Sequence, residues 1–92
     1  MSVLKSGIFT KQLSTDTLII TESMGVRQIS VFNGTSTTGT ALGTQKLSGV
    51  TPDPVNIEEG DTFTVNAIEG SVLDSLTIDA PAGCTLKIIG IV

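Results

Sequence analysis

Short runs in which apolar residues alternate with Thr, Ser or Asn constrain this chain more than any other feature. The clearest is residues 61–67 (DTFTVNA), where every second residue from Phe63 onward is apolar. A period of two residues predicts a half-buried β-strand. No window of ten residues holds a helical apolar period free of Gly or Pro, so the sequence predicts an all-β fold.

Similar runs recur along the chain, separated by clusters of Gly, Pro, Asn and Asp. The expected strands are residues 7–13, 15–22, 26–32, 44–47, 55–57, 61–67, 73–80 and 84–92. Turns are expected at residues 23–25, 33–34, 58–61 and 80–83. The Thr- and Gly-rich residues 35–43 are expected to form an exposed loop or a weak edge strand. Pro52 and Pro54 lack a backbone donor, which excludes a central strand there.

About seven to eight short strands joined by such turns predict an antiparallel β-sandwich or a jelly-roll-like barrel. The length of 92 residues corresponds to a single domain, residues 1–92, with a thin hydrophobic core. Hydrophobic residues make up 39% of the chain and charged residues only 15%, which is typical of a folded protein. A small monomer usually carries more surface charge, so we expect part of this surface to be covered by another molecule.

The last expected strand does not follow the alternating pattern. Leu86 and Ile88 occupy one side, but Ile89 and Ile91 occupy the other. One interpretation is a central strand that its own domain covers on both sides. The other is that Ile89 and Ile91 face a second subunit, which makes them the candidate interface residues. A chain of this length has little material with which to cover both sides.

The charge distribution argues against nucleic acid or an anionic membrane as a partner. The net charge is −4, and the cations Lys5, Lys11, Arg27, Lys46 and Lys87 are scattered along the chain. The first residues lack the basic start and apolar core of a signal peptide. No apolar run approaches the roughly 20 residues of a membrane-spanning helix.

Catalytic residues are sparse. The chain contains no histidine, which removes the usual general base and the commonest transition-metal ligand. Cys84 is the single cysteine; it forms no disulfide within the chain and is expected to be a buried apolar residue. No serine lies in a nucleophile elbow, and no lysine follows a phosphate-binding glycine loop. The sequence therefore predicts a protein without enzymatic activity or cofactor.

The sequence offers partial support for Ca²⁺ binding and little for sugar binding. Asp53, Glu58, Glu59 and Asp61 lie close together in the sequence and offer oxygen ligands for Ca²⁺, although their spacing matches no EF-hand. Convergence with Asp74 or Asp79 would be needed for a Ca²⁺-dependent or hydrolytic site. Sugar binding lacks its usual platform because the chain has no Trp or Tyr, and Phe9, Phe32 and Phe63 are expected in the core.

Residues 56–92, with NIEEGDTFTVNA followed by VLDSLTIDAPAGCTLKIIGIV, resemble small all-β accessory proteins of tailed bacteriophages. The Thr- and Gly-rich middle of the chain has the same texture. The resemblance implies a component of the virion, of the capsid decoration or auxiliary type. It implies contacts with further copies of the chain and with other capsid proteins, and no catalysis.

Three classes of function follow from these observations. The expected one is a virion structural protein, either a capsid auxiliary protein or a tail or fibre component. The alternatives are a receptor- or glycan-binding β-module and the Ca²⁺-dependent protein described above. The C-terminal strand is the first candidate for subunit contact, and residues 35–43 are the next.

Overall fold

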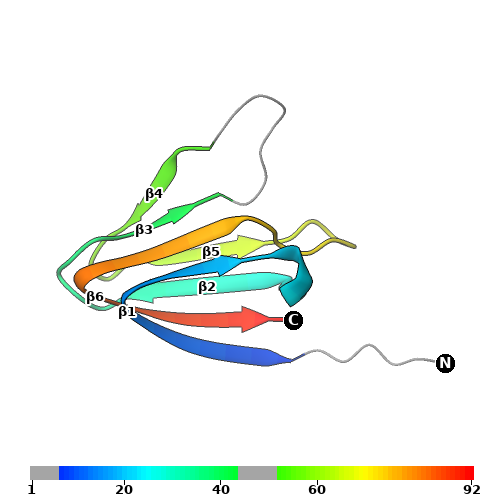
Figure 1. The fold of residues 1–92 in the computed structure, drawn as a ribbon. Helices are drawn as coiled ribbons and strands as arrows, with labels where there is room; N and C mark the ends of the chain where they lie inside the picture. Colours follow the sequence, from blue (N-terminus) through cyan, green and yellow to red (C-terminus); the bar gives the residue numbers. More distant parts are fainter. Residues whose placement is uncertain (1–6, 44–51) are drawn as a thin grey trace.

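The computed structural model describes residues 7–43 and 52–92. Their strands are β1 (Ile8–Ile20), β2 (Gln28–Asn33), β3 (Gly39–Leu42), β4 (Pro54–Ile57), β5 (Thr62–Asn66) and β6 (Leu76–Ile91), and a 3-10 turn, η1 (Glu22–Met24), follows β1. These strands form one antiparallel sheet that is curled over on itself (Figure 1). The prediction of an all-β antiparallel fold is confirmed. The separate sheets of a sandwich or jelly roll stay a prediction.

The two long strands, β1 and β6, pair along most of their length, with β6 inside the sheet and β1 along its edge. They pair from Ile8–Ile91 to Ser14–Thr85 and again from Asp16–Ala80 to Ile20–Leu76. Between these two stretches both strands bend, at the end of the molecule away from the C-terminus (Figure 1). Each long strand therefore contributes to both halves of the sheet.

The continuity of β1 and β6 corrects the sequence prediction. The strands expected at residues 7–13 and 15–22 are parts of the single strand β1, and those expected at residues 73–80 and 84–92 are parts of β6, so the expected turn at residues 80–83 is wrong. The described strands number six instead of seven or eight. Both strands turn without leaving the sheet: β1 does so at a bulge where Thr15 has a φ of 53°, and β6 at a bend where Gly83 has a φ of 83°. Pro81, which has no backbone N–H to donate, lies in this bend, where β6 is not paired with β1.

The other strands add to the outer edge of β6 on either side of the bend. Residues 86–91 of β6 pair with β2, which pairs with β5. Residues 77–79 of β6 pair with β3, which pairs with β4. β4 begins at Pro54 and is an edge strand, as the two prolines predict.

The position of β3 differs from the expectation of an exposed loop or weak edge strand for residues 35–43. β3 lies between β4 and β6, and its Gly39 and Ala41 are buried. A Cβ atom at Gly39 would lie 2.9 Å from Leu86 Cδ1, so the small residues let β3 approach the core. The strand expected at residues 44–47 lies outside the described residues.

One hydrophobic core joins the two halves of the sheet. Leu13, Ile29, Val31, Leu86 and Ile88 come from one half. Ile20, Ala41, Ile57, Leu76 and Ile78 come from the other. Because both halves pack into the same core, their outer faces point away from it in opposite directions. These outer faces are the surfaces that the fold offers to partners.

Asn33, the one buried polar side chain among the described residues, links the end of β2 to its neighbours. Asn33 is fully buried, and its Nδ2 donates to the carbonyl oxygens of Thr37 (2.8 Å) and Ile57 (2.6 Å). Its Oδ1 accepts from the backbone N–H (2.9 Å) and Oγ1 (2.6 Å) of Thr35. Every hydrogen-bonding group of the amide is thereby used, which stabilises a buried polar group in a thin core.

Candidate assembly surface

One outer face of the sheet is four strands wide and almost free of charge. It consists of every second residue of β1 from Ile8 to Ser14, of β2 from Gln28 to Phe32, of β5 from Thr62 to Asn66 and of β6 from Thr85 to Ile91. Paired residues of neighbouring strands share a face, so this assignment follows from the strand register. We call it the Lys87 face, because Lys87 is its one charged residue.

Apolar side chains lie side by side on the Lys87 face. Ile8 is paired with Ile91, and their exposed neighbour Ile89 lies two residues along β6. The exposed fractions are 73% for Ile8 and 53% for Ile89, and Ile91 is half-buried. The structure thus places Ile89 and Ile91 outward, as the sequence pattern predicts. The interpretation in which the domain itself covers this side of β6 does not hold for Ile89.

Phe32 belongs to the same face, which corrects one sequence prediction. Phe9 and Phe63 pack against the core as expected, but Phe32 is 40% exposed beside Lys87. The alternation of Ile29 and Val31 on the inner side of β2 already implied an outward Phe32. Ile8 was missed too, although the inward positions of Phe9 and Leu13 place it on the opposite side of β1.

Hydroxyl side chains form the polar part of the Lys87 face. Ser30 Oγ lies 3.1 Å from Thr64 Oγ1 across β2 and β5. Ser14 Oγ lies 3.1 Å from Thr85 Oγ1 across β1 and β6. These cross-strand hydrogen bonds use short side chains that lose little conformational entropy when a partner covers them.

A shallow hollow of about 370 Å³ opens between β1 and β6, on the side of this face where β1 forms the edge. Its lining includes Thr10, Gln12, Lys87 and Ile89. The hollow is open to solvent, and its lining also includes Lys11 and Ile88, so that it combines two apolar side chains with two cationic ones. It is a recess in the candidate assembly surface.

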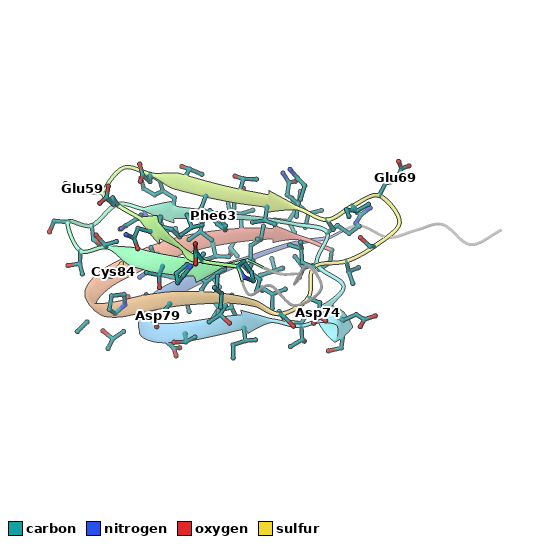
Figure 2. All side chains as sticks on the ribbon, turned by 90° about the horizontal axis from the view of Figure 1, so that it is seen from above. Glu59, Phe63, Glu69, Asp74, Asp79 and Cys84 are labelled. Carbon is teal, nitrogen blue, oxygen red and sulfur yellow. The ribbon has the colours of Figure 1, made fainter. Side chains whose placement is uncertain are left out.

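The second outer face belongs to the other half of the sheet, and we call it the Asp79 face. It consists of Thr17 and Ile19 of β1, Thr40 and Leu42 of β3, Pro54 and Asn56 of β4, and Thr77 and Asp79 of β6. Asp79 is its one charged residue, and Asp79 Oδ1 accepts a hydrogen bond of 2.7 Å from Thr17 Oγ1 (Figure 2). Ile19 is 56% exposed.

Two of the acidic residues considered for Ca²⁺, Asp61 and Asp74, accept hydrogen bonds from the backbone. Asp61 Oδ2 accepts from the backbone N–H of Glu58 at 3.2 Å, within the turn before β5. Asp74 Oδ1 accepts from the backbone N–H of Glu22 at 3.0 Å. Glu59 and Asp74 lie at different ends of the molecule (Figure 2). Among residues 7–43 and 52–92, no three acidic or Cys side chains gather in a way that would hold a metal ion.

Cys84 lies in the bend of β6 and is buried, as the sequence predicts. Its Sγ is 3.6 Å from Thr35 Oγ1 and 4.0 Å from Asn33 Oδ1. The thiol therefore borders the Asn33 cluster. Thr35 and Thr37 belong to residues 35–43, the next candidate contact segment after the C-terminal strand, and both contact Asn33.

Within the part of the chain that the structure describes, no helix is long and apolar enough to cross a membrane. No protein-family model and no curated protein matches the chain. Among solved structures, a chain from the work described as "Bacillus endospore appendages form a novel family of disulfide-linked pili" aligns with 14% sequence identity and a TM-score of 0.43. The alignment covers 95% of this chain and 82% of that one. The functional proposal therefore rests on the faces described above.

Proposed function

We propose that this chain is a non-enzymatic structural subunit that assembles with further copies of itself through the Lys87 face. The observation that carries the proposal is the row of exposed apolar side chains, Ile8, Ile89 and Phe32, on an ordered sheet face with one charge. Apolar surface that is regularly arranged and left uncovered in a small domain is typical of an interaction surface. Depletion of charge at the centre of a surface is also typical of protein interfaces.

The size of this face sets the strength of the contact. Four strands about 4.8 Å apart and about six residues at 3.3 Å each give roughly 19 by 20 Å, or about 400 Å². Stable interfaces bury about 800 Å² on each partner. A single contact through this face is therefore weak, and a durable assembly needs more than one contact for each copy.

Within the class of structural proteins, we favour an accessory component of a tailed-phage virion, of the capsid auxiliary type. The support is the resemblance of residues 56–92, together with a low surface charge that suits a covered protein. A tail or fibre component has the same support. Binding of the purified chain to empty capsids, and its absence with purified tails, is the expected result for the capsid assignment.

The test of self-assembly is sedimentation of the wild-type chain and the Ile91→Asp variant across a concentration series. The wild type is expected to form species heavier than the 9.5 kDa monomer as concentration rises. Ile91→Asp is expected to stay folded by circular dichroism and to need about tenfold more protein for assembly, a difference of about 1.4 kcal/mol. A wild type that stays monomeric throughout contradicts the proposal. An unfolded Ile91→Asp variant would assign Ile91 to the core of the monomer.

A further inference from the structure

The two outer faces carry opposite charges. Among the described residues, Lys87 is the one charge on the Lys87 face, and Asp79 is the one charge on the Asp79 face. Lys87 is exposed between Gln12 and Phe32. Asp79 is partly exposed, and its Oδ2 remains available after Oδ1 has accepted from Thr17. The faces are therefore complementary in charge.

The faces are also complementary in the spacing of charge and apolar surface. On the Lys87 face, Ile89 lies two residues from Lys87 along β6. On the Asp79 face, the paired row of Ile19, Thr77 and Leu42 lies two residues from the row of Asp79. Both separations equal one pleat repeat, about 6.6 Å. When Lys87 of one copy meets Asp79 of another, Ile89 reaches the row that contains Ile19 and Leu42.

Contact between identical faces lacks this match. Two Lys87 faces bring like charges into one interface, and two Asp79 faces do the same. Like charges opposed in an interface cost several kcal/mol and exclude the wrong partner. The charge pattern thus disfavours a twofold dimer and favours contact between unlike faces.

From this complementarity we propose that the Lys87 face of one copy binds the Asp79 face of the next, in a head-to-tail arrangement. This inference rests on the proposed self-assembly and names its partner surface. The two faces point away from the core in opposite directions, so each copy contacts two neighbours. A contact between unlike faces closes into a ring or continues as an open filament, according to the rotation between copies. It also supplies the second contact that the small area of one face requires.

Charge reversal tests the arrangement by sedimentation. Lys87→Glu alone and Asp79→Lys alone are each expected to raise the dissociation constant at least about tenfold. The chain with both changes keeps the wild-type net charge and is expected to assemble within about threefold of wild type. An equimolar mixture of the two single variants is expected to assemble as well, because each supplies the face that matches the other. Glu69→Lys, at the tip of the loop before β6, changes the charge equally and is expected to have no effect (Figure 2).

The outcomes separate the inference from the proposed function. A wild type that never assembles overturns both. A wild type that assembles only as a closed dimer, or a doubly reversed chain that fails to assemble, overturns the head-to-tail contact alone. If a reversed variant does not fold, Lys87→Gln and Asp79→Asn replace it, and both are expected to weaken assembly and reduce its dependence on salt. Unchanged assembly of these neutral variants also overturns the inference.

Discussion

Ile89→Asp is expected to raise the dissociation constant for self-assembly about 100-fold or more, equivalent to about 2.7 kcal/mol. Ile89 lies at the centre of the apolar row on the Lys87 face and is 53% exposed in the monomer. A carboxylate at this position loses its hydration when a partner covers it, and taking an unpaired charge out of water costs several kcal/mol. In the head-to-tail arrangement it also approaches the carboxylate of Asp79.

The matched control is Ile68→Asp. Ile68 is 74% exposed in the segment between β5 and β6 and belongs to neither face. Its replacement adds the same charge and removes the same side chain, so assembly is expected to stay at the wild-type level. Sedimentation measures both variants, and circular dichroism checks that each keeps its β structure. Equal loss of assembly in the two variants would remove Ile89 from the interface.

Asn33→Asp is expected to lower the free energy of unfolding by about 3 kcal/mol or more. This loss of stability belongs to the single chain and does not depend on assembly. The substitution preserves size but replaces the Nδ2 donor with an oxygen that faces the carbonyl oxygens of Thr37 and Ile57. A protonated carboxyl donates to only one of them, and an ionised carboxylate donates to neither. Both possibilities leave buried acceptors without a donor in a cluster that joins β2 to β4.

Chemical denaturation measured below the assembly concentration gives this free energy. Asn56→Asp is the control, because Asn56 is exposed on the edge strand β4 and the same substitution there is expected to change stability by at most about 0.5 kcal/mol. A loss of about 3 kcal/mol in a domain of this size lowers the melting temperature by about 12–24 °C. Equal melting temperatures for Asn33→Asp and Asn56→Asp would show that the Asn33 amide contributes nothing to the stability of the fold.

The sequence predicted those features that depend on local alternation. Phe63 and Val65 of β5 pack against the core, and Leu86 and Ile88 are buried while Ile89 is exposed. The period of two residues contains this information because each side chain's direction follows from that of its neighbour. The edge position of β4 was predicted from the local sequence too, because a proline has no backbone N–H to donate wherever it lies in the chain.

Features that depend on distant pairing were beyond the sequence pattern. Pro81 and Gly83 suit a turn as well as a bent strand, and only the pairing of β6 with β1 on both sides of the bend decides between them. Asn33 resembles a turn residue in the sequence. Its core position follows from carbonyl groups of Thr37 and Ile57, which the fold brings to its side chain. The placement of Lys87 and Asp79 on opposite outer faces also follows only from the strand register, because it depends on which distant strands pair.

The most direct test of the central claim is whether assembly covers the Lys87 face. A trace of the Ile89→Cys variant is mixed with increasing wild-type chain, and the reaction rate of its thiol with a soluble reagent is measured. Cys84 is buried, so the wild type supplies only a slow background. The account predicts that the rate falls about tenfold once about nine-tenths of the chains are assembled, while the thiol of Ile68→Cys reacts at a constant rate. An undiminished rate at position 89 in fully assembled protein would contradict it.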